Sequence, residues 1–442
     1  MSNGTFTGGI HPPDYKEATS QLAIEDIALP DEIFIPLSQH IGAPCTACVE
    51  VGADVSKGQK IGDSESFVSA PVCSSVTGRV TAIEKRKHFT GQEVLGVAIK
   101  VGSQEDQAKT NYLKAIPAWE EADLDELRKL VREAGIVGLG GAAFPTSVKL
   151  SPPADAPIDT VIINGCECEP FLTCDHRLLL EKTEDVIVGS LIMKRVVGAS
   201  RVIIGIEDNK PDAIAHMTKA TASYPDVTVT ALHTKYPQGA EKQLIKATID
   251  REVPMRGLPM KVGALVHNVG TALALSEAVR LGKPLIERVI TVSGPGVKRP
   301  CNLRVPLGTP LNHLIAHAGG LNAAAARIVL GGPMTGWAQA DLSASVVKGT
   351  SGLLALDKAL AATRDEYHDC VRCQRCVRAC PMYLYPNFLA TAAEHKQWSA
   401  ADKDGALDCV ECGACAFDCP ANRPMVRFIR DAKAAVMARQ RA

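Results

Sequence analysis

Short apolar runs separated by turn signals dominate the first quarter of the chain. Between residues 33 and 101 the runs are broken by dipeptides that favour turns, among them Val51-Gly52, Lys57-Gly58 and Thr77-Gly78. Regular alternation of this kind is typical of several short strands in an all-β unit. The pattern therefore predicts a small β domain, to which we assign residues 1–115.

The periodicity of the apolar positions changes after this unit. Between residues 120 and 134 they recur at helical spacing, at Leu124, Leu127, Leu130 and Val131. This spacing predicts a helix that ends near Gly135. Two buried strands follow, at residues 161–163 and 201–207, with a helix at residues 174–182 between them. Because helices and strands alternate, we predict a doubly wound α/β domain over residues 116–286.

The last third of the chain shows two further patterns. Residues 287–320 read as two short strands around a Gly-Pro-Gly turn, followed by a helix, and we assign residues 287–350 to a third domain. Residues 387–403 and 425–441 are polar and helix-forming. The remaining residues, 351–442, are therefore predicted to form a helical fourth domain.

Composition narrows the possible functions. The 442 residues carry a formal net charge of -1, which gives no reason to expect binding to nucleic acid. The longest uncharged run, residues 305–326, contains proline, histidine and a Gly-Gly pair, so no membrane segment is expected. The N-terminal residues lack the basic start and apolar core of a secretory signal, and we expect a cytoplasmic protein.

The cysteines carry the first strong chemical signal. Eight of the 15 fall into two copies of the spacing C-x₂-C-x₂-C-x₃-C-P. The first copy is Cys370, Cys373, Cys376 and Cys380, and the second is Cys409, Cys412, Cys415 and Cys419. In bacterial two-cluster ferredoxins the fourth cysteine of such a run binds the cluster of the other run.

This rule predicts two [4Fe-4S] clusters with crossed ligands. The predicted ligands of cluster 1 are Cys370, Cys373, Cys376 and Cys419. The predicted ligands of cluster 2 are Cys409, Cys412, Cys415 and Cys380. Four thiolates also suit zinc, but zinc would explain neither the prolines nor the duplicated fourth cysteine. The other seven cysteines are best read as small buried side chains, although a redox or metal role for the Cys45-x-x-Cys48 pair stays open.

Two loops of the predicted α/β domain are candidate binding sites. Residues 135–150 contain Gly138, Gly140 and Gly141, which would let backbone N-H groups approach a phosphate, and Lys149 could add a charge. Residues 164–170 bring Asn164, Glu167 and Glu169 to the end of a buried strand, where small ligands of α/β sheets bind. From these residues alone, a plain turn and solvated acids remain alternatives.

Four motifs in order match a known family. GLGGAAFP, NGCECEP, KYPQGAEKQLI and VHNVGT resemble the flavin-binding subunit of respiratory complex I. With FTGGIHPP at the front and the double ferredoxin motif at the end, the whole chain resembles the C subunit of the Rnf electron-transport complex.

The resemblance implies a fold for each domain. It implies a Rossmann-like flavin domain, followed by a β-grasp domain of the SLBB type and a helical double [4Fe-4S] ferredoxin domain. Residues 55–80 also resemble the barrel-sandwich fold of biotinyl and lipoyl carriers. No lysine lies between Lys60 and Arg79, which argues against a swinging arm.

The resemblance also implies the residues that bind FMN and NAD(H). It places Gly138, Gly140 and Gly141 against FMN, with Lys149 near the phosphate. It places Asn164 and Glu167 near the flavin and its ribityl chain. The far side of the flavin would be closed by Tyr236, Gly239, Glu241, Asn268 and Thr271. Phe144, Lys149 and Glu169 match positions that line the nicotinamide nucleotide pocket.

Three residues depart from the complex I pattern. Cys166 stands where an Asp would be, Ala240 where a Glu would be, and His267 where an Asn would be. Each departure weakens a contact to the flavin or the nucleotide. His267 could carry a proton near the flavin or be a packed core histidine, and the sequence supports both readings equally.

The implied function is that of a peripheral NAD-reactive subunit of an ion-translocating ferredoxin:NAD⁺ oxidoreductase. Its partners would be ferredoxin and the membrane and cluster-bearing Rnf subunits, at the cytoplasmic face of the inner membrane. One alternative is a soluble cobalamin reductase of the propanediol-utilisation type, although here the β unit precedes the flavin domain. Another is an electron-relay subunit without flavin, which the three departures would allow.

The basic C-terminal helix adds a further question. Residues 425–441 include Arg427, Arg430, Lys433, Arg439 and Arg441 against the single acid Asp431. A solvated helix face is the ordinary reading of such charge. Docking of an acidic partner such as ferredoxin, or of a membrane subunit, is the alternative.

Overall fold

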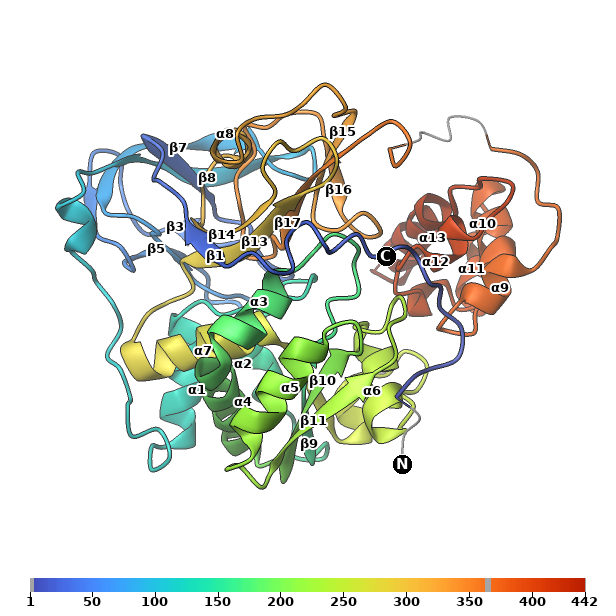
Figure 1. Ribbon diagram of the computed structural model, residues 1–442, viewed down its shortest axis with the longest axis horizontal. Helices are drawn as coiled ribbons and strands as arrows, with labels where there is room; N and C mark the ends of the chain where they lie inside the picture. Colours follow the sequence, from blue (N-terminus) through green and yellow to red (C-terminus); the bar gives the residue numbers. More distant parts are fainter. Residues whose placement is uncertain (1–3, 362–366, 442) are drawn as a thin grey trace.

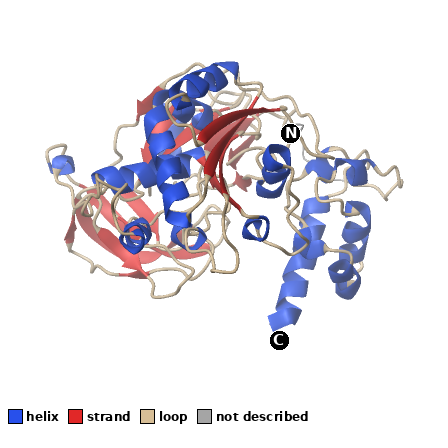
Figure 2. Ribbon diagram, turned by 90° about the horizontal axis from the view of Figure 1, so that it is seen from below, coloured by secondary structure: helices blue, strands red, loops and turns tan. Residues whose placement is uncertain are grey.

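The computed structural model describes residues 4–361 and 367–441 and contains β-rich, α/β and helical parts (Figure 1). Seen from below, the helices of the C-terminal part form a group beside the mixed α/β body (Figure 2). Within the described residues no helix is long and apolar enough to cross a membrane.

The N-terminal β unit consists of two small antiparallel sheets. Strands β2 (Glu32–Pro36), β8 (Glu93–Val101), β7 (Gly78–Lys87) and β4 (Asp54–Val55) form the first sheet in this order. The second sheet has β3 (Thr46–Ala47), β5 (Lys60–Asp63) and β6 (Val72–Cys73). Ile33 and Ile35 alternate with other residues along β2 and are fully buried, as are Val97 and Ile99 on β8. These four residues share one hydrophobic cluster, so one face of the first sheet lies in the core of the unit, and the intervening Phe34 and Ala98 are buried as well.

The α/β domain is built on a parallel sheet of four strands. Their order in space is β11 (Val227–Leu232), β10 (Arg201–Glu207), β9 (Thr160–Gly165) and β12 (Ala264–Asn268). The chain runs outward from β9 to β11 and then returns to the other side of β9 with β12. The order therefore reverses between β9 and β12, and the crevice at the carboxyl ends of two such strands is where open α/β sheets bind ligands.

Helices surround this sheet and carry most of its hydrophobic core. They are α1 (Leu124–Glu133), α2 (Thr146–Lys149), α3 (Cys174–Glu181), α4 (Thr183–Val197), α5 (Pro211–Thr221), α6 (Glu241–Ile249) and α7 (Val269–Leu281). Helix α1 begins later than the predicted residue 120. The cause is Asp123, whose carboxylate accepts hydrogen bonds from the backbone N-H groups of Asp125 and Glu126 and so caps the helix.

The third sheet combines segments that are far apart in the sequence. Its order is β1 (Ile24–Asp26), β14 (Cys301–Pro306), β13 (Glu287–Ser293), β17 (Gly352–Leu356), β15 (Arg327–Leu330) and β16 (Trp337–Gln339), and it packs with α8 (Leu311–His317). Both β1 and β17 lie outside the predicted boundaries of this domain, 287–350. Strand β17 pairs with both β13 and β15, so the sheet is completed only by residues that the sequence assigned to the helical domain.

The C-terminal part is helical, as the polar helix-forming segments predicted. It contains α9 (Arg375–Ala379), α10 (Pro386–Glu394), α11 (Trp398–Lys403), α12 (Ala414–Phe417) and α13 (Met425–Arg441). Residues 4–16, which we call the N-terminal strap, run between this part and the α/β domain (Figure 1). The strap joins the two parts through backbone hydrogen bonds from Gly9 to Ala379 and between Ile10 and Tyr236.

Candidate functional site

Two asparagines lie directly opposite each other where the strand order reverses. Asn164 near the end of β9 and Asn268 at the end of β12 are register partners. The Asn164 amide donates to the Gly239 carbonyl at 2.8 Å. The Asn268 side chain accepts from the Gly270 N-H at 2.8 Å, which caps α7, and donates to the Asp175 carboxylate at 2.5 Å. Both side chains thus fix the loops around the carboxyl edge of the sheet.

The glycine-rich loop is closed by its own backbone. The Gly138 N-H donates to the Phe144 carbonyl at 2.8 Å, and the Leu139 N-H donates to the Thr271 hydroxyl at 2.9 Å. A Cβ atom at Gly140 would lie 3.2 Å from the Asn268 Cβ, whereas one at Gly141 would meet open space. The loop therefore approaches Asn268 closely at Gly140, where only a glycine avoids crowding.

Two carboxylates extend from the loop after β9. The Glu167 carboxylate accepts hydrogen bonds from the backbone N-H groups of Asp175 at 2.7 Å and His176 at 3.2 Å, at the start of α3. The Glu169 carboxylate accepts from the Met334 N-H at 2.9 Å and from the Thr335 hydroxyl at 2.5 Å. Glu167 thus anchors the loop within the α/β domain, and Glu169 anchors it to the third sheet.

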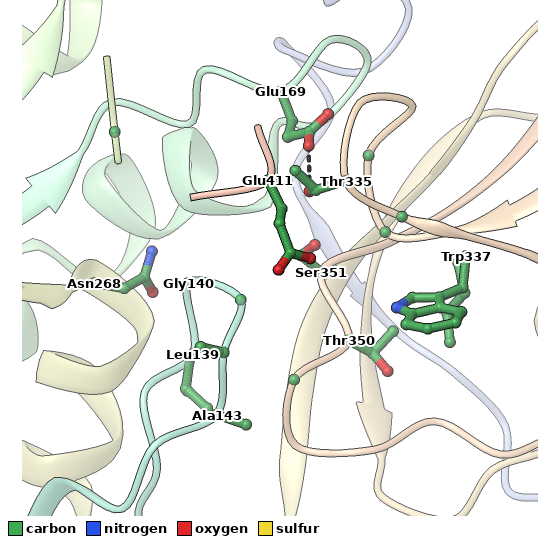
Figure 3. A pocket seen from close by; sticks show the side chains of 18 of the residues that line it. Leu139, Gly140, Ala143, Glu169, Asn268, Thr335, Trp337, Thr350, Ser351 and Glu411 are labelled. Atoms are coloured by element: carbon green, nitrogen blue, oxygen red, sulfur yellow. Dashed lines mark hydrogen bonds between the residues drawn. The ribbon is translucent and has the colours of Figure 1, made fainter. Parts of the chain in front are cut away.

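These loops line a large cavity of about 660 Å³. This volume lies in the range of pockets that hold cofactors and drug-sized ligands. Figure 3 shows Gly140 and Asn268 on one side, Trp337 and Thr350 on the other, and Glu411 between them. The cavity is therefore bounded by the α/β domain, the third sheet and the helical part.

Aromatic side chains from the third sheet and from the N-terminal β unit form part of the wall. Phe89 comes from the N-terminal β unit and Trp337 from β16, and their ring centroids lie 6.1 Å apart in an edge-to-face arrangement. The Arg430 guanidinium lies 5.5 Å from the centroid of the Trp337 ring. Such a wall offers both a flat apolar surface and a cation to a ligand.

Basic residues of α13 turn toward this cavity. Arg430 and Lys433 each donate to the Glu411 carboxylate at 2.6 Å, and all three residues line the cavity. Lys433 also donates to the Cys409 carbonyl at 2.9 Å. Arg430 still has 42% of its side chain exposed, as a solvated helix face predicts, whereas Lys433 has only 19% exposed; for both, the loop between Cys409 and Cys412 supplies an acidic partner.

Burial changes the protonation of several groups around the cavity. Burial and the nearby Glu167 charge raise the pKa of Asp175 far above the usual range of a carboxyl group. Burial also raises the pKa of Glu169. Both carboxyl groups therefore favour the protonated, neutral form more than an exposed carboxyl group does.

His267 lies in the core and not on the cavity. Burial and the Lys149 charge lower the pKa of its imidazole well below the ordinary value, and its Nε2 atom has no hydrogen-bond partner among the described residues. Of the two readings of His267, the structure favours the neutral, packed histidine.

Eight of the predicted flavin and nucleotide residues line the cavity. They are Gly140, Gly141, Asn164, Glu167, Glu169, Tyr236, Gly239 and Asn268. The other five, Gly138, Phe144, Lys149, Glu241 and Thr271, are not among its lining residues in the described part of the chain. Lys149 instead donates to the Glu241 carboxylate at 2.6 Å and to the Val266 carbonyl at 2.9 Å.

The departures from the complex I pattern differ in their surroundings. Cys166 is fully buried in a core cluster and does not line the cavity. Ala240 does line it. The cysteine therefore changes the packing beneath the loop, and the alanine changes the surface that a ligand would meet.

The predicted cluster cysteines gather around two small cavities. Cys380, Cys409, Cys412 and Cys415, the inner cysteine set, line one cavity. Cys370, Cys373, Cys376 and Cys419, the outer cysteine set, line the other. Each cavity thus holds three cysteines of one run and the fourth of the other. Four thiols around one small space are a donor set that suits a [4Fe-4S] cluster.

The inner set adjoins the large cavity. Cys409 and Cys412 line both the large cavity and the small one. The Tyr236 hydroxyl, itself part of the large cavity, donates to the Cys412 carbonyl at 2.7 Å. The large cavity at the glycine-rich loop therefore adjoins the small cavity of the inner set through Cys409 and Cys412.

Sequence reasoning missed several of the lining residues. Phe89, Trp337 and Glu411 come from three different domains, and no local pattern marks them. Arg430 was marked only as one charge of a basic helix. Asp175 could have been found, because it follows the NGCECEP motif and opens the predicted helix, where an acidic side chain is common.

Family models match four successive parts of the chain. Residues 4–104 match the RnfC barrel sandwich hybrid domain and residues 131–277 match the Nuo51 FMN-binding domain. Residues 289–338 match the SLBB domain, and residues 369–423 match a 4Fe-4S dicluster domain. These matches confirm the predicted four-part fold class and its FMN and double-cluster domains.

A solved structure shares the fold at lower similarity. The air-oxidised NAD⁺-reducing [NiFe]-hydrogenase has a chain that aligns with a TM-score of 0.52 and 20% identity, covering 76% of this chain and 73% of its own length. At this identity the likeness shows the fold alone.

Curated relatives match over nearly the whole length. The chain is 42% identical to the C subunit of the Na⁺-translocating ferredoxin:NAD⁺ oxidoreductase complex of Acetobacterium woodii, covering 100% of this chain and 99% of the relative. It is 44% identical to the C subunit of the proton-translocating ferredoxin:NAD⁺ oxidoreductase complex of Clostridium ljungdahlii, over 90% of this chain and 86% of the relative. It is 41% identical to the C subunit of the ion-translocating oxidoreductase complex of Rhodobacter capsulatus, over 100% of this chain and 85% of the relative. With four domains in the expected order and full-length identity above 40%, the chain belongs to the family of Rnf complex C subunits.

Proposed function

We propose that this chain is the NAD-reactive peripheral subunit of an ion-translocating ferredoxin:NAD⁺ oxidoreductase complex. It would pass electrons between NAD(H), FMN and two [4Fe-4S] clusters. Its partners would be the other subunits of the complex and ferredoxin, as the names of its relatives suggest. We further propose that it is attached through these partners at the cytoplasmic face of the membrane.

One observation carries this proposal. A single cavity is lined both by the loops of the FMN-binding domain and by Cys409 and Cys412 of the inner cysteine set. When bound, FMN exchanges a hydride with a nicotinamide and single electrons with iron–sulfur clusters. A nicotinamide and a cluster need such an intermediate, because the first transfers two electrons together and the second transfers one at a time. A site that joins these surfaces suits such an exchange.

The residues of the cavity would hold the cofactor and the nucleotide in distinct ways. Gly140 and Gly141 leave room for close approach to the backbone, and Asn164 and Asn268 fix the loops on both sides of the strand reversal. The Arg430 guanidinium and the Trp337 ring would face the more exposed end of the ligand. Glu169, tied to Thr335, would hold the third sheet against the loop that carries it.

The crossed cysteine sets would hold the two clusters. The inner set would take cluster 2 and the outer set would take cluster 1. Because the inner set shares two lining residues with the large cavity, cluster 2 would be the one nearer the flavin.

The test is an anaerobic titration of the whole chain with its clusters reconstituted. FMN is added first, and NADH is then added while flavin absorbance and the EPR signals of the clusters are followed. We expect one FMN to bind and NADH to bleach both the flavin and the clusters. Clusters that form without flavin binding would favour the flavin-free relay instead.

A matched pair of substitutions tests whether the cavity is the site. Ala142 is exposed and lines the cavity, whereas Ala222 is exposed after α5 and does not line it. Ala142→Trp should fill space in the cavity and weaken FMN binding. Ala222→Trp adds the same side chain elsewhere and should leave FMN binding unchanged.

A further inference from the structure

The N-terminal strap contacts both the inner cysteine region and the loop that carries Glu167 and Glu169. At one end, the Gly9 N-H donates to the Ala379 carbonyl at 2.9 Å, directly before Cys380. A Cβ atom at Gly8 would lie 2.7 Å from the Cys380 carbonyl oxygen. The two glycines of the FTGGIHPP motif therefore allow the strap to lie against the cysteine segment.

The strap then crosses the α/β domain. Ile10 and Tyr236 exchange backbone hydrogen bonds of 2.8 and 2.9 Å, and the Phe171 N-H donates to the Asp14 carbonyl at 2.7 Å. The rings of Tyr15 and Phe171 stack with centroids 4.8 Å apart. These contacts hold the strap in place up to its last residue, Lys16.

Lys16 is buried, with 7% of its surface exposed. Its ammonium donates to three carbonyl oxygens of one loop, at 2.8 Å to Glu167, 2.9 Å to Glu169 and 2.5 Å to Leu172. No carboxylate within the described residues forms an ion pair with it. Burying an ammonium group is costly unless its N-H groups are hydrogen-bonded. Lys16 is therefore stable in this position only while the loop presents these carbonyls, and its hydrogen bonds in turn favour the loop conformation that presents them.

The same loop forms a wall of the large cavity. Glu167, Cys168, Glu169 and Leu172 all line it, while Lys16 does not. Glu167 adopts a positive φ of 48°, which a side chain other than glycine keeps only when its surroundings hold it. The hydrogen bonds from Lys16 to the loop carbonyls add to that constraint, which the Glu167 carboxylate also supplies through the Asp175 and His176 N-H groups.

We propose that Lys16 is a positioning residue for the FMN and nucleotide site: through three backbone carbonyls, the N-terminal strap holds the 167–172 loop in its binding shape. This inference rests on the proposed function. It also gives the strap a role in the site, although all of the strap belongs to residues 4–104, which match the barrel-sandwich family.

The test compares Lys16→Met with Lys16→Arg in the full chain with reconstituted clusters. The methionine keeps much of the length and removes the donors, while arginine restores a cationic donor. Lys283→Met is the matched control, because Lys283 is also largely buried but donates to Glu277 and Glu287 outside the cavity. The readouts are the Kd for FMN, from flavin fluorescence, and hydrogen exchange of the 166–172 amides.

We expect Lys16→Met to weaken FMN binding by about tenfold or more and to speed amide exchange in the loop. Lys16→Arg should recover part of the affinity, and Lys283→Met should leave it within about twofold of the wild type. Gly9→Ala is a second route, because its Cβ would lie 2.7 Å from the Tyr236 carbonyl oxygen and displace the strap without changing Lys16. It should shift the same two readouts in the same direction.

Unchanged FMN affinity and loop exchange in both Lys16→Met and Gly9→Ala would overturn the inference and leave the proposed function intact. Equal losses of affinity in Lys16→Met and Lys283→Met would overturn it as well, because they would show only general destabilisation. A wild-type chain that binds no FMN would instead contradict the proposed function, and the inference with it.

Discussion

Exchanging one thiol in each cysteine run tests how the clusters are held and which of them serves the cavity. The substitutions are Cys380→Ala and Cys419→Ala, one from each of the two small cavities. Both side chains have 8% of their surface exposed, so the two changes remove thiols of equal burial. They differ in the cluster that each is expected to remove.

The expected magnitudes follow from the two sets. Each variant loses one of four ligands at one site, so each should retain about half of its iron. Cys380 belongs to the inner set, which shares Cys409 and Cys412 with the large cavity. Its loss should therefore stop NADH from reducing the remaining cluster. Cys419→Ala should keep the inner cluster and its reduction by NADH.

The assay combines iron determination with EPR of the NADH-reduced chain after FMN loading. If each run of four cysteines instead bound its own cluster, Cys380 would belong with Cys370, Cys373 and Cys376. The two substitutions would then have the opposite effects. If Cys380→Ala keeps an NADH-reducible cluster while Cys419→Ala loses it, the crossed assignment is wrong. Loss of all iron in both variants would equally contradict two independent sites.

Three further changes test the walls of the cavity. Gly332→Ala would place a Cβ 2.3 Å from the Glu169 carboxylate, so we expect displacement of Glu169 and a higher KM for NADH with little change in kcat, measured by steady-state kinetics. Asn268→Ala removes the cap of α7 and should cost about 1–2 kcal/mol of unfolding free energy in denaturant titration, and a smaller loss than about 0.5 kcal/mol would show that the cap is dispensable. Burial and the Glu167 charge raise the pKa of Asp175 to about 7, so the folded chain binds this proton more tightly than the unfolded chain. Wild-type stability should therefore fall relative to Asp175→Asn as the pH rises from about 4 to 7, and parallel stability curves would contradict this.

The elements with a clear local pattern were predictable from the sequence. Strands β9 and β10 lie where the apolar runs predicted them, and the helix at residues 425–441 matches its predicted bounds. Local hydrophobic periodicity decides such elements, because each buries a continuous face or run. The spacing of the cysteines also predicted the two iron–sulfur clusters from the sequence alone.

Pairings between distant segments could not be predicted in the same way. Strand β1 has only three residues and pairs with β14, almost 280 positions later, at Ile24 and Asn302. The cavity wall at Trp337 and Arg430 is likewise created by the packing of two domains. No periodic pattern encodes such contacts, since they depend on how complete domains meet.

Lys149 shows that the partner of a charged side chain depends on how distant segments pack. The sequence placed this cation near a phosphate, but in the structure it lies within 2.6 Å of the Glu241 carboxylate. The pairing depends on the relative positions of α2 and α6, whose sequences are about 90 residues apart. A motif can supply a charged residue without showing which opposite charge lies nearest to it.

The contact between Gly9 and Ala379 has a consequence for biosynthesis. The ribosome makes the strap well before its backbone partner beside Cys380, which follows some 370 residues later. The strap therefore cannot dock on this partner until the residues between the two have been made, and forming a contact of such long range is slow. The four inner cysteines follow Ala379 in the chain, so they too are made well after the strap.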